Sequence, residues 1–557
     1  MGLFLQDSFD HEPKTALDPH TSVQSIDEVT PDPAQESTLQ LFEGEPLADE
    51  QQWRPGVRDW LVFICIAILT MMDAFDASVL IPMLPDLANT FDNSFVSVLW
   101  INAAYLMLNA TSQLFFTMMC DVFSHGAVWI IAVVLTTIGT GISSGSMSLI
   151  ELVIGRLVQG IGGGGAMSLC FVLVTESTPK HIHSRYSCYI LLTRLIGTMI
   201  GPVVGGIFID YANWTWAFYF NFIFCALGML VIPFAVDLRV SKSIPLRKLR
   251  ILDWSGASMA FLGPAGILVG LSWGGISYRW NEWQTLMPIV VGTILFVTLV
   301  FYESKWALHP QFGTRVFRDR SVAMTYLGCF CHGFVIFCQL QFFTLYFIST
   351  KYLSTSLSGV TLLAITGLAI APAAVVGVIL AREPQCCKWI ISGSWALLIL
   401  ASGCSILLDG ATPTIGWVFL FFSMGLGHGL LLSSYNIRVQ SIPKDEESAL
   451  STMPIIVSNF LRTWGMAFAI SVGGVFYLNV LSHELHGIGL NGELVNTAKG
   501  YIILMDQVRM SSTEREAIKD ASALALQVVW EVITGVAAVG GISSAFLWKN
   551  RPSDINI

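Results

Sequence analysis

Charged residues are scarce in this chain. Asp, Glu, Lys and Arg make up 12% of its 557 residues, whereas soluble globular domains carry about 25%. Hydrophobic residues reach 54%, and the mean hydropathy is +0.65. So little charge excludes an ordinary soluble protein. Apolar blocks of about 20 residues recur along the chain, which is the length a helix needs to cross a bilayer.

Motifs for nucleotide and metal chemistry are also missing. No G-x-x-x-x-G-K-[ST] stretch is present, which excludes an ATP-driven pump of the P-loop type. The stretch "GIGGGG", residues 160–165, matches G-x-G-x-x-G, but it follows no strand and lies inside an apolar block. "SHELHG", residues 482–487, lacks the H-E-x-x-H spacing. We therefore expect no cofactor, no metal, no nucleic-acid partner and no enzymatic activity, because the polar segments hold no catalytic constellation.

The polar segments at the N-terminus are acidic. Residues 1–52 hold twelve acids and a single base, Lys14, and they lack apolar periodicity. This composition predicts a disordered acidic cytoplasmic tail over residues 1–57, not a cleaved signal peptide. None of the eleven cysteines falls in a predicted outer segment, so we expect no structural disulfide.

The apolar blocks predict an all-α polytopic membrane protein with fourteen transmembrane helices. The predicted spans are 60–84, 95–117, 127–145, 149–174, 186–209, 214–236, 254–274, 284–303, 321–348, 357–381, 389–408, 414–436, 450–479 and 526–548.

Lysine and arginine set the predicted orientation. The inner segments carry most of these residues, while the six short outer loops carry only Arg279 and Lys351. This bias places both termini, including residues 549–557, in the cytoplasm. A long outer loop is expected over residues 481–524. Within it, residues 511–527 have the pattern of a short amphipathic helix, with Ser511 or Ser512 as the cap and Glu514 completing a capping box.

Several charged residues stand inside predicted spans, and four of them are matched in depth. Asp73 and Asp76 are three residues apart in the first span and so share one helical face. A charge at the bilayer centre costs about 2.5–3.5 kcal/mol, and such residues usually mark a transport pathway. Counting residues from the span ends matches Asp76 in depth with Arg156 of the fourth span, and Asp73 with Arg194 of the fifth.

These depths lead to a hypothesis of proton coupling. Two carboxylates one turn apart should titrate as a coupled set. Protonation of Asp76 would favour one orientation of a transport cavity, and its ionised form, bonded to Arg156, would favour the other. The alternative is that Asp73, Asp76, Arg156 and Arg194 form satisfied ion pairs that only lock the helices together.

The fifth span carries a distinctive stretch, "GTMIGPVVGG", residues 197–206. Small residues four apart let helices approach closely, and a proline inside a span removes a backbone donor and bends the helix. The stretch is either a generic packing seam or a motif with a transport role. Its key residues are Gly197, Gly201, Pro202, Gly205 and Gly206.

Four further stretches favour a motif with a transport role over a generic packing seam. They are "DASVLIPMLP" (76–85), "IGRLVQGIGGGGAMS" (154–168), "NWTWAFYFN" (213–221) and "NFLRTWGMAFAISVGGVF" (459–476). Together with residues 197–206 they resemble, in order, the motifs of the major facilitator superfamily. Over residues 60–548 the chain is similar to the fourteen-span drug:proton antiporter group, particularly its fungal efflux pumps.

This resemblance implies the major facilitator fold. We expect six-helix bundles over residues 58–236 and 321–548, with residues 237–320 supplying a basic cytoplasmic loop and two extra central helices. Residues 197–206 would be the antiporter motif. The resemblance also implies gating roles for Asp121 and Arg462. The family loop G-x-L-a-D-R-x-G-R-R reads "TMMCDVFSHGAV" here, residues 117–128, so Asp121 remains while the basic residues are lost.

The function implied is a proton-coupled exporter of small, largely apolar organic compounds such as a toxin, secondary metabolite or drug. Its partners would be the cargo, protons and membrane lipid. We expect a monomer in the plasma membrane, or in a vacuolar or vesicular membrane. The alternatives are a siderophore-iron proton symporter and a non-transporting sensor. His332 and His428 are expected to be packing residues, although both lie within spans.

Overall fold

A computed structural model describes residues 55–91, 95–179, 182–235, 253–307, 319–362, 367–381, 384–442, 452–487 and 511–547. Within these ranges the chain is helical, apart from short turns and an isolated bridge between Gly274 and Tyr278. Nearly all of the predicted acidic tail, most of the basic loop after residue 235, and the C-terminal residues 549–557 lie outside the described residues.

The first half of the chain forms one group of packed helices. These are α2 (Val57–Ser78), the short η1 (Ile81–Met83) and α3 (Leu84–Thr90), α4 (Phe95–Val122), α5 (His125–Ser144), α6 (Leu149–Ser177), α7 (His183–Tyr211) and α8 (Thr215–Ala235). Helix α6 packs along both α4 and α5, and α2 packs along α7 and α8. The apolar residues of these helices meet in a continuous buried core.

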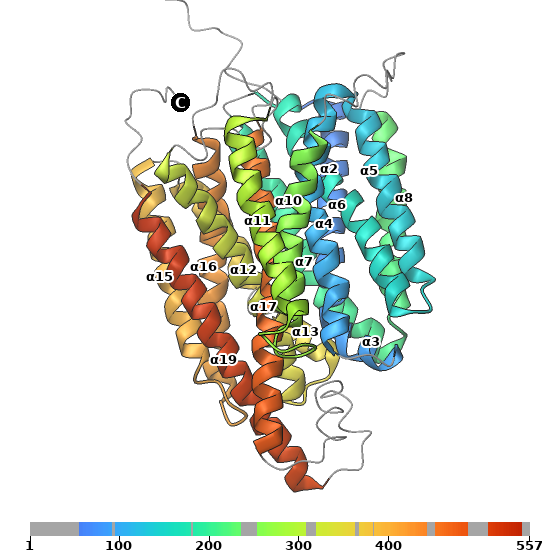
Figure 1. The fold of residues 1–557 in the computed structure, drawn as a ribbon. Coiled ribbons are helices and arrows are strands. Elements are labelled where there is room, and N and C mark those ends of the chain that lie inside the picture. The colour runs from blue at the N-terminus through green and yellow to red at the C-terminus, as the bar shows by residue number, and fades with distance from the viewer. Residues whose placement is uncertain are drawn as a thin grey trace, which may run out of the picture. The chain divides into compact units, whose positions relative to one another are not determined.

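The second half forms another group. Its helices are α12 (Arg320–Ser349), α13 (Thr355–Leu362), α14 (Leu368–Leu380), α15 (Pro384–Ser405), α16 (Thr414–Gln440), α17 (Met453–Gly487) and α19 (Ser512–Ala545). Between the two groups in sequence lie α10 (Trp254–Trp273) and α11 (Trp283–Lys305), which pack on each other; α10 also contacts α4 and α17 (Figure 1).

Twelve described helices are long and apolar enough to cross a membrane. The predicted count of fourteen therefore stays a prediction. The two spans outside this set are 95–117, which falls on α4, and 357–381, which falls on α13 and α14 with residues 363–366 outside the described part.

Both ends of the predicted outer loop, residues 481–524, are helical in the structure. Helix α17 continues to Gly487, and α19 runs unbroken for 34 residues from Ser512. The separate amphipathic helix predicted over 511–527 is therefore wrong, because no proline interrupts residues 512–545 and the helix continues into the last span. The predicted cap is confirmed: the Ser511 hydroxyl accepts from the Glu514 backbone N–H at 3.2 Å, and the Glu514 carboxylate accepts from the Ser511 N–H at 2.9 Å.

Replacing Ser511 by Ala is expected to loosen the first turn of α19. Loss of an N-cap costs about 1 kcal/mol, which corresponds to roughly fivefold faster amide exchange in that turn. Hydrogen–deuterium exchange of the purified chain measures this directly. Exchange in the middle of α19 should not change, and unchanged exchange in the first turn would show that tertiary contacts, not the cap, hold it.

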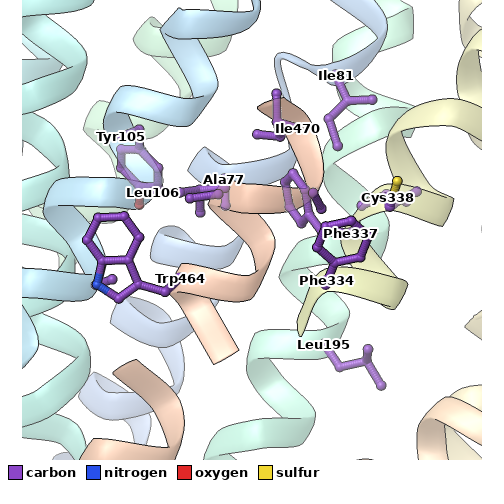
Figure 2. Packing of buried hydrophobic residues seen from close by; sticks show 14 of the residues in the cluster. Ala77, Ile81, Tyr105, Leu106, Leu195, Phe334, Phe337, Cys338, Trp464 and Ile470 are labelled. Carbon is purple, nitrogen blue, oxygen red and sulfur yellow. The ribbon is translucent and has the colours of Figure 1, made fainter. Parts of the chain in front are cut away.

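The two groups of helices meet along a buried apolar interface. Figure 2 shows residues from both groups in one cluster: Ala77, Ile81, Tyr105, Leu106 and Leu195 from the first half, and Phe334, Phe337, Cys338, Trp464 and Ile470 from the second. Helix α4 lies along α17, and α7 lies along α13. The functional residues considered next lie at this interface or next to it.

Candidate functional site

The end of α2 provides the backbone acceptors of the site. Pro82 and Pro85 cannot donate to the preceding turn, and the chain leaves α-helical geometry after Ser78. Carbonyls in the last turn of a helix seek other donors. The Asp76 carbonyl accepts from Arg156 Nη2 at 2.8 Å, and the Ala77 carbonyl accepts from Asn102 Nδ2 at 2.9 Å.

The Asp76 carboxylate is held by neutral amides. Its side chain is 1% exposed, and Oδ2 accepts from Gln159 Nε2 at 2.9 Å and from Asn221 Nδ2 at 2.8 Å. Both amides also donate to the hydroxyl of Thr140, each at 3.0 Å. Four helices, α2, α5, α6 and α8, thus meet at one carboxylate.

Arg156 does not bind this carboxylate, which corrects the predicted Asp76–Arg156 bond. In the described part of the chain, the guanidinium donates through Nη1 to Gln159 Oε1 at 2.7 Å, and through Nη2 to the Asp76 backbone and to Asn102 Oδ1 at 3.1 Å. It also lies 4.0 Å over the Tyr105 ring. The physical reason is that Gln159, about one turn from Arg156 on α6, inserts its amide between the two charges.

Asp73 lies beside a cation, as predicted. Arg194 Nη2 is 3.6 Å from Asp73 Oδ2, and both side chains are buried. The other carboxylate oxygen, Oδ1, accepts from the Tyr105 hydroxyl at 2.9 Å and from Asn109 Nδ2. The predicted contact between Asp73 and Arg194 is confirmed, and it differs in kind from the amide cradle of Asp76.

Arg194 also links the two halves of the molecule. Its Nη1 donates to Asn459 Oδ1 on α17 at 2.8 Å, and Asn459 Nδ2 donates to Gln113 Oε1 on α4 at 2.9 Å. Gln113 Nε2 in turn donates to Asn109 Oδ1 at 3.1 Å and to the Thr463 hydroxyl at 3.3 Å. We call these residues, with Asp73, the interface network; its members are Asp73, Asn109, Gln113, Arg194, Asn459 and Thr463.

Replacing Arg194 by Gln is expected to lower the free energy of unfolding by about 3–5 kcal/mol, because it leaves the Asp73 charge buried without a cation. The Asp73→Asn/Arg194→Gln double variant should recover most of this loss. Thermal denaturation of the purified protein in detergent measures both. Arg185→Gln, at an exposed position on the same helix, is the control and should change little. Equal damage in the single and double variants would contradict an ion pair.

Residues 197–206 pack α7 against two partners at once. A Cβ at Gly197, Gly201 or Gly205 would collide with backbone or side-chain atoms of α2 or of the two residues that follow it, Val79 among them. Gly206 faces the other way, and a Cβ there would lie within 2.6 Å of the Thr355 and Ser356 backbone at the start of α13. The glycines therefore permit close approach both within the first half and between the halves.

A hydrogen bond next to this contact joins the same two helices. The Asp210 carboxylate accepts from the Ser356 backbone N–H at 2.9 Å. Near the other end of α7, Asn436 Nδ2 donates to Cys188 Sγ at 2.9 Å. Helix α7 thus touches the second half near both of its ends, so the halves are closed together in this structure.

Of the two predicted gating residues, Asp121 and Arg462, the structure describes the side chain of Arg462. Asp121 lies in the last turn of α4, but its side chain lies outside the described residues. His125, which stands where the family loop is basic, has its Nε2 3.2 Å from Glu176 Oε1 of α6. Arg462 is buried in α17, where its guanidinium interacts electrostatically with the Cys329 thiol. Gating roles for Asp121 and Arg462 stay predictions.

A cavity lies between the halves, bounded by α7, α12, α13 and α16. Its lining is largely apolar. Gln339 and His428 are the polar residues of that lining. Met199, which lies between Gly197 and Gly201 on α7, lines the cavity from the first half.

Sequence reasoning missed the amide residues of the site. Gln159, Asn221 and Asn459 stand in the quoted motifs without being predicted as site residues, and Asn109 and Gln113 lie outside those motifs. Their signal was available: a carboxamide inside an apolar span must find a hydrogen-bond partner, so it marks a polar contact between helices.

Comparison with known proteins decides the family. A model described as "Major Facilitator Superfamily" matches residues 66–470. The chain belongs to the Major Facilitator Superfamily. Membership in this superfamily of transporters confirms the expected fold class and the expectation of a transporter instead of an enzyme. With its apolar helices, it also makes the chain a multi-pass membrane protein.

Several curated relatives of this superfamily member come from fungi. It is 27% identical over 526 residues to "MFS transporter L2" of a Phoma species, covering 94% of this chain and 87% of the relative. It is 25% identical to "Efflux pump FUS6" of Gibberella moniliformis, covering 94% and 91%. A third relative, at 25% identity with 89% and 91% covered, is the "Acurin A biosynthesis cluster MFS-type transporter" of Aspergillus aculeatus.

Solved structures support the fold of this superfamily member. A bacterial homologue of the human lysosomal transporter Spinster matches with a TM-score of 0.54 at 14% identity, covering 90% of this chain and 100% of that one. The human organic anion transporter MFSD10 matches with a TM-score of 0.53 at 14% identity, covering 88% and 100%. At such identities the likeness shows the fold alone.

Proposed function

We propose that this chain is a proton-coupled exporter of small, largely apolar organic compounds, and that Asp76 carries the proton. The observation that supports this most is the amide cradle of Asp76. A buried carboxylate whose partners are neutral amides gains or loses a proton without breaking an ion pair. Asn221 Oδ1, an acceptor with no hydrogen-bond partner among the described residues, is available to the protonated carboxyl after rotation of that amide.

The interface network couples the protonation of Asp76 to the contact between the two halves. Asp73 lies one helical turn from Asp76, so a change of charge at Asp76 changes the field on Asp73. Asp73 shares Arg194 with Asn459 of the second half. A proton at Asp76 therefore biases the contact between the halves, and a bias between two arrangements is what coupling requires.

The cavity favours apolar cargo. Phenylalanine, methionine, leucine and isoleucine side chains make up most of its lining, which suits an organic compound with an apolar body. Relatives named as efflux pumps agree with the export direction. A ferric siderophore, the cargo of the rival symporter, is a polar metal complex and fits this lining poorly.

Location and assembly belong to the same proposal. We place both termini in the cytoplasm, in line with the lysine and arginine bias. The plasma membrane is the expected location, since export from the cell needs it. A monomer in contact with lipid is sufficient, because one chain supplies both sides of the cavity.

The test is transport by the purified full-length chain in proteoliposomes with an imposed pH gradient. A panel of apolar drugs and ferric siderophores is offered in turn, and an internal pH dye reports proton flux. We expect apolar compounds to discharge the gradient and siderophores to have no effect. Discharge by siderophores alone would favour the symporter, and discharge by no compound would contradict proton-coupled transport.

A further inference from the structure

Two histidines at the cavity have no role in the proposed proton step. His332 on α12 and His428 on α16 are 0% and 2% exposed, and their ring centroids lie 5.3 Å apart with the ring planes tilted by 36°. His332 shares a helical face with Ile336 and Gln339, which line the cavity, because these residues are three and four apart. His428 lines the cavity itself.

The described hydrogen bond of His428 is to Gln339. Gln339 Nε2 donates to the Ser402 hydroxyl at 3.0 Å, so its Oε1 faces His428 Nε2 at 2.7 Å. A carbonyl oxygen only accepts, so with this amide orientation Nε2 of a neutral His428 carries the hydrogen and Nδ1 is an acceptor. That Nδ1 and both ring nitrogens of His332 have no hydrogen-bond partner among the described residues.

Three unpartnered nitrogen atoms in one buried place are costly. A buried donor or acceptor without a partner loses the hydrogen bonds that water would give it, so native proteins keep few of them. A packing role does not account for them, because phenylalanine would pack here without this cost. A bound molecule that supplies the missing partners does account for them.

The chemistry of that molecule follows from the nitrogen atoms. His428 Nδ1 needs a donor, and a neutral His332 offers one donor and one acceptor. A hydroxyl group both donates and accepts, so it satisfies both rings at once. The positively charged Arg462 guanidinium acts on His332, which disfavours a cationic cargo.

We propose that the cavity binds a cargo with an apolar ring body and a free hydroxyl group, and that His332 and His428 together recognise this hydroxyl. The ring body lies against Phe343 and Phe421, and the hydroxyl points to the histidine pair. This inference rests on the proposed function, because it names the class of compound that the exporter carries.

The test uses a matched pair of probes, 2-naphthol and 2-methoxynaphthalene, with the purified full-length protein in detergent. The ether keeps the ring body and an acceptor but cannot donate. We expect the wild type to bind 2-naphthol about tenfold or more tightly than the ether, since the ether leaves His428 Nδ1 without a partner. In His332→Phe the preference should shrink several-fold. Comparing variants cancels the different partitioning of the probes into micelles.

Stability without probe provides the second measurement. His332→Phe removes two unpartnered nitrogens and should unfold at the same or a higher temperature than the wild type. His428→Phe is the matched contrast, and it should unfold at a lower temperature because it breaks the bond to Gln339. Destabilisation of His332→Phe would show that His332 has partners and would overturn the proposal.

The binding outcomes are equally decisive. Equal affinity of the wild type for both probes, binding of neither probe, or an unchanged preference in His332→Phe would each overturn the proposal. Asp76→Asn, tested beside them, separates it from the proposed function. If the probe preference is intact in wild type and Asp76→Asn while transport shows no dependence on a pH gradient, only the proton-coupled function fails.

Discussion

Asp76→Asn is expected to abolish export driven by a pH gradient while cargo exchange without a gradient continues. Coupling free energies of about 1–3 kcal/mol correspond to roughly 5- to 150-fold effects, so we expect driven export to fall by more than tenfold. The fold should survive, because the carbonyl oxygen of the substituted side chain can still accept from Gln159 and Asn221.

The measurement compares two modes of transport in the same proteoliposomes. Counterflow of labelled cargo at equal pH on both sides reports the conformational cycle, and gradient-driven efflux reports coupling. Asp86→Asn, which removes a less buried acid from neighbouring α3, is the control and should retain both modes. Driven export at wild-type rates in Asp76→Asn would exclude Asp76 as the proton carrier.

Gly206→Val should also stop transport, but for a steric reason. The new side chain would collide with the Thr355 and Ser356 backbone of the other half, so the contact between α7 and α13 could not close. We expect transport to fall by at least tenfold, since one arrangement of the cycle is lost. Gly205→Val meets the Val79 carbonyl within its own half, so it should reduce folding yield instead.

Spin labels can report the Gly206→Val effect directly. Labels at Tyr211→Cys on α7 and Leu357→Cys on α13, with exposed Cys386 and Cys404 replaced by Ser, should be further apart in Gly206→Val than in the parent protein. The volume control is Gly535→Val, because nothing lies within 4 Å of a Cβ built at Gly535. Unchanged label distances together with normal transport would show that this contact need not close.

The sequence predicted the large features of the fold because the bilayer imposes them. A span must be apolar and about 20 residues long, so composition alone reveals it. The two exceptions, α4 and the start of α19, also follow from composition. Helix α4 carries many amides and hydroxyls that face other helices, which lowers its hydropathy. The helical start of α19 is polar because it precedes the last span, so pattern alone marked it as a separate helix.

The sequence predicted where the charged residues of the site lie, but not all of their hydrogen-bond partners. Residue depth placed Arg194 beside Asp73 correctly, since depth depends only on the rise per residue. Depth also placed Arg156 beside Asp76, whose backbone carbonyl it binds, but depth says nothing about a third side chain between Arg156 and the carboxylate. Gln159 occupies that position through a rotamer choice that depends on α2, α5 and α8 together.

The amide of Gln159 between Arg156 and Asp76 has a kinetic consequence. A direct, buried ion pair would have to rupture in every cycle, and breaking one costs about 3–5 kcal/mol. Added to an activation barrier, that amount would slow each turnover by roughly two to four orders of magnitude. Exchanging one amide hydrogen bond for another costs far less. Under the proposed function, Gln159 separates the two groups, so that Asp76 can change its protonation state while Arg156 keeps its hydrogen bonds.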